Sequence, residues 1–256
     1  MAIERITSRS NPLVARLKKL NSKRSVRREE GVFCGEGPKL LAEALKWGAE
    51  IETIISAEGA QLPPLPSNTR VVEVPENLLP VMADTETPQG IIFLVRGTKL
   101  HLPDSLTGRR YLVLDGVQDP GNLGTIWRTA DAFGADGLIL CNGCADPWSP
   151  KTIRATMGAA FRMPVYEASL EDTAKKLLEA GIPLYATALR EDTEDVRDVS
   201  LDKAAVIIGS EGRGVSELAL DLCQKTVKIP MTERCESLNA AIAASVVLWE
   251  MARDKL

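Results

Sequence analysis

The stretch that decides the fold is YLVLDGVQDPGNLGTIWRTADAFGADGLILCNG, residues 111–143. An apolar strand pattern (YLVLDGV) precedes a helical segment (TIWRTADAFGA), and a second apolar strand pattern (GLILCNG) follows. Short apolar strands that alternate with helices are typical of a mostly parallel sheet with helices on both faces. Because the alternation continues along the chain, we expect an α/β fold for residues 110–256.

The preceding part of the chain predicts a smaller α/β domain at residues 1–96. Strand patterns at VFCGEG, IETIISAE, RVVEVP and GIIFLV accompany the helical pattern PKLLAEALKWG. The segment 97–109, which follows, lacks clear periodicity and contains glycine and proline, so we interpret it as a linker.

The first 30 residues form a basic arm on an acidic chain. They hold nine Lys and Arg residues against three Glu, a net charge of +6, whereas the whole chain carries −4. Such an arm could contact phosphates, and a solvated helical face is an equally good interpretation from charge alone. Leu13, Leu17 and Leu20 recur at helical spacing after a cap at Ser10 or Asn11, which predicts a short amphipathic helix.

Composition is that of an ordinary globular protein, with 45% hydrophobic and 26% charged residues. No apolar run approaches the roughly 20 residues that span a bilayer, and MAIERITSRSNP lacks the apolar segment of a secretory signal. We therefore expect a cytoplasmic protein with no membrane partner. Cys141 and Cys144 form a close pair, but a structural zinc site needs about four ligands, so we interpret them as two small thiols at a strand end and expect no metal.

Ligands of such sheets bind beyond the carboxyl ends of the strands, where three segments carry unusual residues. In GNLGTIWRTADAFGA, the spacing places Asn122 in the turn and Arg128 about one turn into the helix. A structural arginine paired to a carboxylate is the alternative interpretation. In IIGSEGRGVSEL, the glycine order GxxGxG matches neither the dinucleotide fingerprint nor the P-loop. Glu211 instead places an anion there, which suits a cationic ligand better than a phosphate.

The third segment, KIPMTERCESLNAAIAASVV, leaves a strand and enters an alanine-rich helix. Ser237 and Asn239 lie at the start of that helix, where Ser237 would be a natural cap. Together the three segments resemble the three motifs of the SpoU (TrmH) family of S-adenosylmethionine-dependent RNA ribose 2'-O-methyltransferases, in the SPOUT superfamily. The likeness spans roughly residues 110–253. Residues 30–96 resemble more weakly the ribosomal-protein-like substrate-binding domain that is often joined to this family.

The resemblance implies a deep trefoil knot near the C-terminus and a bent cofactor, S-adenosylmethionine, held by main-chain atoms. The catalytic residues that it implies are Asn122, Arg128, Glu211, Ser237 and Asn239. The cofactor-binding residues that it implies are Thr187, Ala188, Gly209, Gly214, Ile229, Met231 and Leu238. We expect Arg128 to bind the adjoining phosphate and stabilise the developing alkoxide, because a guanidinium donates bidentate hydrogen bonds and stays protonated.

The expected partners are RNA and a second copy of the chain. Family members with this extra domain favour ribosomal RNA, of the large subunit, over transfer RNA, and are typically dimers through the C-terminal domain. The candidate RNA-binding residues are Arg24, Arg27, Arg28, Lys39, Lys151 and Arg154. Three alternatives stay open: a noncatalytic RNA-binding or ribosome-assembly factor, a tRNA ribose methyltransferase, and a nucleotide-dependent oxidoreductase suggested only by the α/β alternation.

Overall fold

The computed structural model describes residues 3–67, 69–232, 234 and 237–253. It divides into two compact units by its contacts. Unit 1 comprises Met1–Thr98 with Trp148–Phe161, and unit 2 comprises Lys99–Pro147 with Arg162–Leu256.

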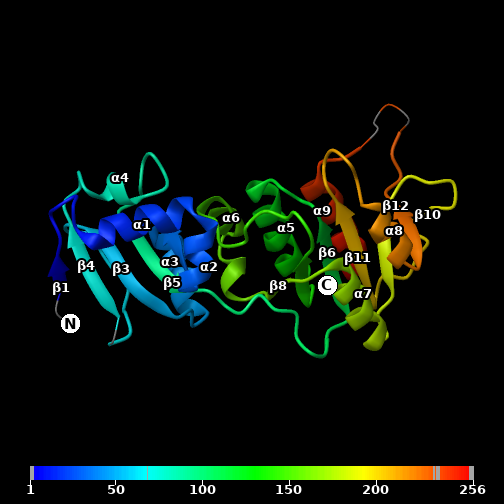
Figure 1. Ribbon diagram of the computed structural model, residues 1–256, viewed down its shortest axis with the longest axis horizontal. Helices are drawn as coiled ribbons and strands as arrows, with labels where there is room; N and C mark the ends of the chain where they lie inside the picture. The colour runs from blue at the N-terminus through cyan, green and yellow to red at the C-terminus, as the bar shows by residue number, and fades with distance from the viewer. Residues whose placement is uncertain (1–2, 68, 233, 235–236, 254–256) are drawn as a thin grey trace. The chain divides into compact units, whose positions relative to one another are not determined.

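Unit 1 is built on a mixed five-stranded sheet in the order β1-β4-β3-β5-β2 (Figure 1). β1, β3 and β4 run parallel, whereas β5 is antiparallel to both β2 and β3. The strands are β1 (Ile3–Arg5), β2 (Val32–Glu36), β3 (Ile51–Ala57), β4 (Arg70–Val74) and β5 (Ile91–Arg96). The helices are α1 (Pro12–Ser22), α2 (Arg24–Glu30), α3 (Pro38–Lys46), α4 (Leu79–Met82), α6 (Pro150–Thr156) and the short 3-10 helix η1 (Ala159–Phe161).

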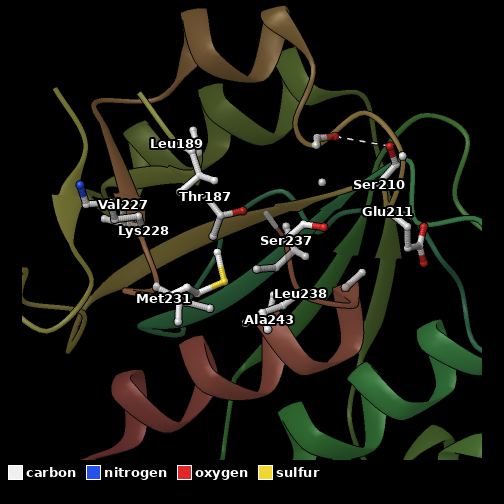
Figure 2. Close-up of a pocket in the computed structure, with 17 residues that line it drawn as sticks. Thr187, Leu189, Ser210, Glu211, Val227, Lys228, Met231, Ser237, Leu238 and Ala243 are labelled. Carbon is white, nitrogen blue, oxygen red and sulfur yellow. Dashed lines mark hydrogen bonds between the residues drawn. The ribbon is translucent and has the colours of Figure 1, made fainter. Parts of the chain in front are cut away.

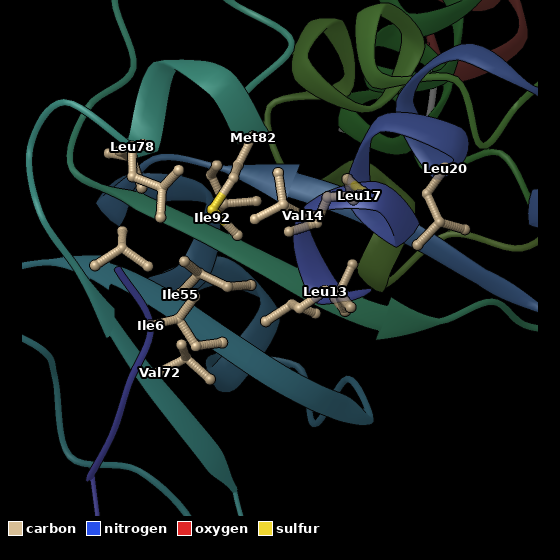
Figure 3. Close-up of a cluster of buried hydrophobic side chains, with 14 of the residues drawn as sticks. Ile6, Leu13, Val14, Leu17, Leu20, Ile55, Val72, Leu78, Met82 and Ile92 are labelled. Atoms are coloured by element: carbon tan, nitrogen blue, oxygen red, sulfur yellow. The ribbon is translucent and has the colours of Figure 1, made fainter. Parts of the chain in front are cut away.

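The basic arm is folded into unit 1. The Asn11 side chain caps α1 by accepting a hydrogen bond from the Leu13 amide at 2.9 Å, and Leu17 and Leu20 are fully buried. Figure 3 shows α1 side chains packed against the strands that carry Ile55 and Ile92. The predicted amphipathic helix is therefore confirmed, and its apolar face stabilises the core of unit 1.

The segment Trp148–Phe161 packs with unit 1, although the sequence places it inside the 110–256 domain. The Phe33 ring on β2 stacks on the Trp148 ring, with centroids 4.6 Å apart and planes 8° from parallel. The same ring also stacks on Phe161. This aromatic packing joins residues more than a hundred positions apart, which periodicity along the chain could not predict.

Unit 2 is a seven-stranded parallel sheet in the order β10-β12-β9-β11-β6-β7-β8 (Figure 1). The strands are β6 (Arg110–Asp115), β7 (Gly137–Leu140), β8 (Val165–Glu167), β9 (Leu184–Thr187), β10 (Glu194–Asp195), β11 (Ala204–Gly209) and β12 (Lys225–Lys228). The helices are α5 (Pro120–Ala132), α7 (Leu170–Glu179), α8 (Glu217–Leu222) and α9 (Ala240–Ala252). α5 packs on α9, and α7 packs on α8. The expected α/β fold with a parallel sheet is confirmed.

The strand order of unit 2 reverses between β6 and β11, which are neighbours. From β6 the chain crosses through α5 to β7 on one side, and from β11 it crosses through α8 towards β12 on the other. Because the two connections leave in opposite directions, the carboxyl ends of these strands mark the switch point at which ligands of parallel sheets usually bind. Asp115 and Gly209, at those two ends, are register partners.

The predicted linker 97–109 is largely docked on unit 2. The Leu100 carbonyl accepts a hydrogen bond from the Glu167 amide at 2.6 Å, so this segment extends the sheet at the free edge of β8. Leu106 is buried in the core of the unit, and Lys176 donates to the Pro103 carbonyl at 2.7 Å. An unpaired strand edge and a buried leucine thus order a segment that has no periodicity of its own.

Candidate functional site

A cavity of about 420 Å³ opens beyond the carboxyl ends of β9, β11 and β12. All seven residues predicted to bind the cofactor line it: Thr187, Ala188, Gly209, Gly214, Ile229, Met231 and Leu238. Figure 2 shows Thr187, Met231 and Leu238 around one hollow, with Glu211 at its margin. Three segments that lie far apart in sequence therefore meet here, because parallel strands bring their carboxyl ends to one edge of the sheet.

Sequence reasoning missed other residues of the lining. These are Leu189, Ile208, Ser210, Gly212, Val227, Lys228, Ala240 and Ala243. Each lies next to or near a predicted residue in the sequence, so extending each motif along its strand or helix would have found them. Of the described lining residues, only Glu211 and Lys228 carry a charge, and the rest contribute main chain, apolar side chains and the hydroxyls of Thr187, Ser210 and Ser237.

The glycine loop that follows β11 is held by its own backbone. Ser210 and Gly214 exchange backbone hydrogen bonds of 2.9 and 3.0 Å, which closes the loop between them. A Cβ on Gly209 would lie 2.1 Å from the Gly214 carbonyl carbon and 2.2 Å from the Val215 nitrogen. Gly209 is therefore required by the returning backbone, whereas Gly212 has open space where its Cβ would stand.

Three of the predicted catalytic residues form a chain of hydrogen bonds at the cavity margin. The side-chain amide of Asn122 donates to Glu211 Oε1 at 2.6 Å, and the side-chain amide of Asn239 donates to Asn122 Oδ1 at 3.3 Å. Glu211 also lines the cavity, so the chain reaches from α5 and α9 to the pocket itself. Asn122 thus orients the Glu211 carboxylate, and Asn239 orients Asn122 in turn.

Helix caps set the positions of both asparagines. α5 begins at Pro120, earlier than the sequence indicates. The Asp119 side chain caps the helix by accepting a hydrogen bond from the backbone N–H of Asn122 at 2.8 Å. Asn122 thus lies in the first helical turn and not in the preceding loop. Asn239 caps α9 by accepting from the Ala241 amide at 2.9 Å. The expectation that Ser237 caps this helix is wrong.

The remaining two predicted catalytic residues, Ser237 and Arg128, are both exposed. Ser237 is exposed and lines the cavity. Arg128 is exposed on α5, six residues after Asn122, which corresponds to a rotation of about 120° to a different helix face. Among the described residues, the bonds that join Asn122, Glu211 and Asn239 do not include Arg128.

Cys141 and Cys144 are free, buried cysteines that follow the end of β7. Burial raises the pKa of Cys141 to about 12 and that of Cys144 to about 11. Cys144 donates to the Leu114 carbonyl at 3.2 Å. Among the described residues there is no group of three or more His, Cys, Asp or Glu arranged to hold a metal ion. In the same part of the chain, no helix is both long and apolar enough to cross a membrane.

The six candidate RNA-binding residues all belong to unit 1, but they differ in exposure. Arg24, Arg28, Lys39 and Lys151 are exposed. Arg154 is half-buried and pairs with Asp84 at 2.7 Å. Arg27 is 5% exposed, and its guanidinium donates to the carbonyls of Leu20 and Asn21 at the end of α1. Its place is structural, because it satisfies carbonyls that the helix end leaves without partners.

Comparison with known proteins agrees with this geometry. Residues 109–249 match the model of the SpoU rRNA Methylase family, and residues 11–92 match that of the MRM3-like substrate binding domain. The chain is 33% identical over 252 residues to the 23S rRNA (guanosine(2553)-2'-O)-methyltransferase RlmP of Bacillus subtilis (strain 168), covering 97% of this chain and 99% of that protein. It is 30% identical to the mitochondrial rRNA methyltransferase 3A of Danio rerio, covering 95% of this chain and 68% of that protein.

Solved structures are similar over nearly the whole chain. The AdoMet-bound rRNA methyltransferase from Sinorhizobium meliloti has a TM-score of 0.87 and 33% identity, with 99% of each chain covered. The SpoU methyltransferase AviRb from Streptomyces viridochromogenes, in complex with the cofactor AdoMet, has a TM-score of 0.84 and 28% identity, with 96% of this chain and 98% of that chain covered. With a parallel sheet, a strand-end cavity and three motifs that meet there, the chain belongs to the SpoU rRNA methylase family.

Proposed function

We propose that this protein transfers a methyl group from S-adenosylmethionine to a ribose 2'-hydroxyl in ribosomal RNA. The observation that carries the proposal is the Asn239–Asn122–Glu211 chain of hydrogen bonds at the margin of the strand-end cavity. It joins a pocket of cofactor size to an exposed surface that an RNA strand can reach. Family membership and the rRNA methyltransferase activity named for two similar proteins support the same function.

The cavity fits S-adenosylmethionine in size and chemistry. Its volume of about 420 Å³ lies within the roughly 300–1,000 Å³ of small-molecule sites. Main-chain groups and apolar side chains suit an adenosine, and the Glu211 carboxylate favours a cationic sulfonium over a phosphate. The residues that would hold the cofactor are the seven named above, with Met231 and Leu238 against the apolar parts.

When bound, S-adenosylmethionine supplies an electrophilic methyl group. Glu211, held at the cavity margin by the side-chain amide of Asn122, would fix the ribose hydroxyl by accepting its hydrogen bond. A hydroxyl is a poor nucleophile until its proton leaves, so the Glu211 carboxylate would take up that proton as the methyl group passes from sulfur to oxygen, and S-adenosylhomocysteine would be left as the product. Asn239 holds Asn122 in turn, and Ser237, which lines the cavity, would contact the ribose.

Arg128 would act on the RNA backbone. Its exposed guanidinium on α5 would donate bidentate hydrogen bonds to a phosphate and stabilise the developing alkoxide. A lysine keeps the charge but cannot donate two parallel hydrogen bonds to one phosphate, so Arg128→Lys should lower kcat. If the variant kept normal turnover and lost only RNA affinity, catalytic participation of Arg128 would be excluded.

The substrate that we favour is large-subunit ribosomal RNA, bound in part by unit 1. Support comes from the match to a substrate binding domain and from the exposed cations Arg24, Arg28 and Lys39. Phosphate contacts position an RNA but do not identify it, so these residues carry affinity and not nucleotide choice. Arg27 is excluded from this surface by its burial.

We further propose a trefoil knot, a homodimer and a cytoplasmic location. The chain leaves β12, which lies beyond β9, and returns to pack α9 on β11 and β6, a path that is compatible with a knot. On α9, Ile242 and Trp249 are 53% and 52% exposed and suit a subunit contact, whereas Val247 belongs to the core. A crystal structure with S-adenosylhomocysteine tests the knot, light scattering tests the dimer, and cell fractionation tests the location.

The decisive experiment combines methyl transfer in vitro with mapping of 2'-O-methyl sites in cells. Purified protein with tritiated S-adenosylmethionine should label ribosomal RNA from cells that lack the gene. Glu211→Gln should reduce labelling strongly, and the exposed Glu179→Gln on α7 should not. Binding of S-adenosylhomocysteine with no transfer to any RNA would favour a noncatalytic factor. A methyl group lost only from transfer RNA would overturn the ribosomal substrate.

A further inference from the structure

Asp115 is a buried carboxylate that the proposed chemistry does not use. It ends β6 and is 7% exposed. Its Oδ2 atom accepts a hydrogen bond from the Ser216 backbone amide at 2.7 Å, across 101 residues of chain. Burying a carboxylate costs free energy unless hydrogen bonds satisfy it. An aspartate at this buried position therefore calls for a structural or functional explanation.

The Asp115 bond ties the glycine loop to the sheet. The loop leaves β11 after Gly209, closes on itself between Ser210 and Gly214, and returns at Ser216, which caps α8. The Ser210–Gly214 bonds fix the shape of the loop but not its direction. The hydrogen bond from the Ser216 amide to Asp115 fixes the end of the loop against β6. This anchor sets the direction in which the loop tip with Glu211 points.

Asp115 also begins the connection to the second half of the site. Immediately after it, residues 116–119 lead into α5, where Asp119 holds the backbone of Asn122. The two connections therefore start from one point, the adjacent ends of β6 and β11, and meet again at the 2.6 Å Asn122–Glu211 bond. Loss of the anchor at Asp115 would let the two halves separate.

We propose that Asp115 is a positioning residue that holds the Ser210–Ser216 loop in the arrangement that binds S-adenosylmethionine, and so sets cofactor affinity. The inference rests on the proposed function. A charged acceptor makes a stronger bond to an amide than a neutral one does. Alanine removes the bond, whereas asparagine keeps an acceptor of the same shape without the charge.

Asp136, an exposed carboxylate just before β7, offers a control at the opposite end of β6. Its Oδ2 accepts from the backbone amides of Arg109 and Arg110, both at 2.8 Å, far along β6 from the cavity. Asp136→Ala thus removes the same kind of carboxylate–amide bond from β6 without touching the loop. Both alanine variants should lower the thermal midpoint.

The test uses the full chain, calorimetric titration with S-adenosylhomocysteine, and hydrogen exchange followed by mass spectrometry. Asp115→Ala should weaken binding roughly tenfold or more and speed amide exchange over residues 210–216. Asp115→Asn should recover most of the affinity, and Asp136→Ala should change neither quantity. Affinity of Asp115→Ala within twofold of Asp136→Ala, or unchanged exchange in the loop, would overturn the inference. If the unaltered protein bound no S-adenosylhomocysteine, the proposed function would fail instead, and the exchange data would still report on the anchor.

Discussion

Replacing Gly209 by alanine tests whether the backbone at Gly214 and Val215 packs so closely on this position that only glycine fits. The added Cβ would stand 2.1 Å from the Gly214 carbonyl carbon, where ordinary contacts begin at 3.4 Å. The atoms nearest to it are backbone, so a side-chain rotation cannot relieve the clash. The loop must move by more than about 1 Å, against the Ser210–Gly214 bonds and the Ser216–Asp115 bond.

The expected cost follows from overpacking and from the strained or broken hydrogen bonds. Overpacking of a tight interior costs about 1–3 kcal/mol, and each lost hydrogen bond about 0.5–1.5 kcal/mol. We expect Gly209→Ala to lower the free energy of unfolding by about 3 kcal/mol. For a unit of this size, that corresponds to a fall of roughly 6–12 °C in the thermal midpoint. Because the displaced loop lines the cavity, affinity for S-adenosylhomocysteine should fall at least about tenfold.

Gly212→Ala is the matched control, since Gly212 lies in the same loop, lines the same cavity and has nothing within 4 Å of its would-be Cβ. Scanning calorimetry and calorimetric titration of both variants give the comparison. Gly212→Ala should move the midpoint by no more than about 2 °C. If Gly209→Ala behaved like Gly212→Ala in both assays, the close approach of the two backbone segments would be wrong.

Three further predictions follow from particular contacts. Asn122→Ala should lower kcat about 10- to 100-fold and leave S-adenosylhomocysteine affinity within about twofold, because Asn122 orients the carboxylate but is absent from the described cavity lining. Arg27→Ala should reduce stability by about 2–4 kcal/mol in urea unfolding, because it strips carbonyls at the end of α1 of their donor. Glu52→Gln should destabilise the protein more at pH 7 than at pH 3, because the Arg16 hydrogen bond lowers the pKa of Glu52.

The sign of the last effect follows from linkage. A carboxyl whose folded pKa is lowered adds stability above its unfolded pKa, which lies near 4.5, and loses it as the pH falls through the folded value. Equal destabilisation at both pH values would contradict the ion pair. For Arg27, the exposed Lys18→Ala on α1 is the control, and similar losses from both would show that burial is irrelevant. For Asn122, a proportional loss of cofactor affinity would place the residue in the pocket.

Several features of this protein were predictable from sequence because they depend on local patterns. Apolar strands alternating with helices define the parallel sheet, and leucines at helical spacing define the buried face of α1. The seven residues that the family resemblance assigned to the cofactor lie at or after the ends of three strands and line one cavity, because parallel strands place their carboxyl ends at one edge. Family motifs added the roles of individual side chains, which periodicity does not reveal.

Helix boundaries were less predictable, because competing caps stand close together in the sequence. Ser237 and Asn239 are both good cap residues, and the backbone conformation at Asn239 decides between them. Asp119 and Pro120 likewise move the start of α5 ahead of the glycines, which sequence analysis assigned to the turn.

The sequence by itself determined the elements of this protein and the edge of the sheet at which its chemistry lies. Only the tertiary structure decided which of those residues touch. Arg27 became a buried helix cap, Trp148 joined unit 1 through Phe33, and Asn122 met a carboxylate 89 positions away. The physical reason is that helix and strand formation depends on neighbours in the chain, whereas hydrogen bonds and aromatic packing depend on neighbours in space, which the three-dimensional path of the chain selects.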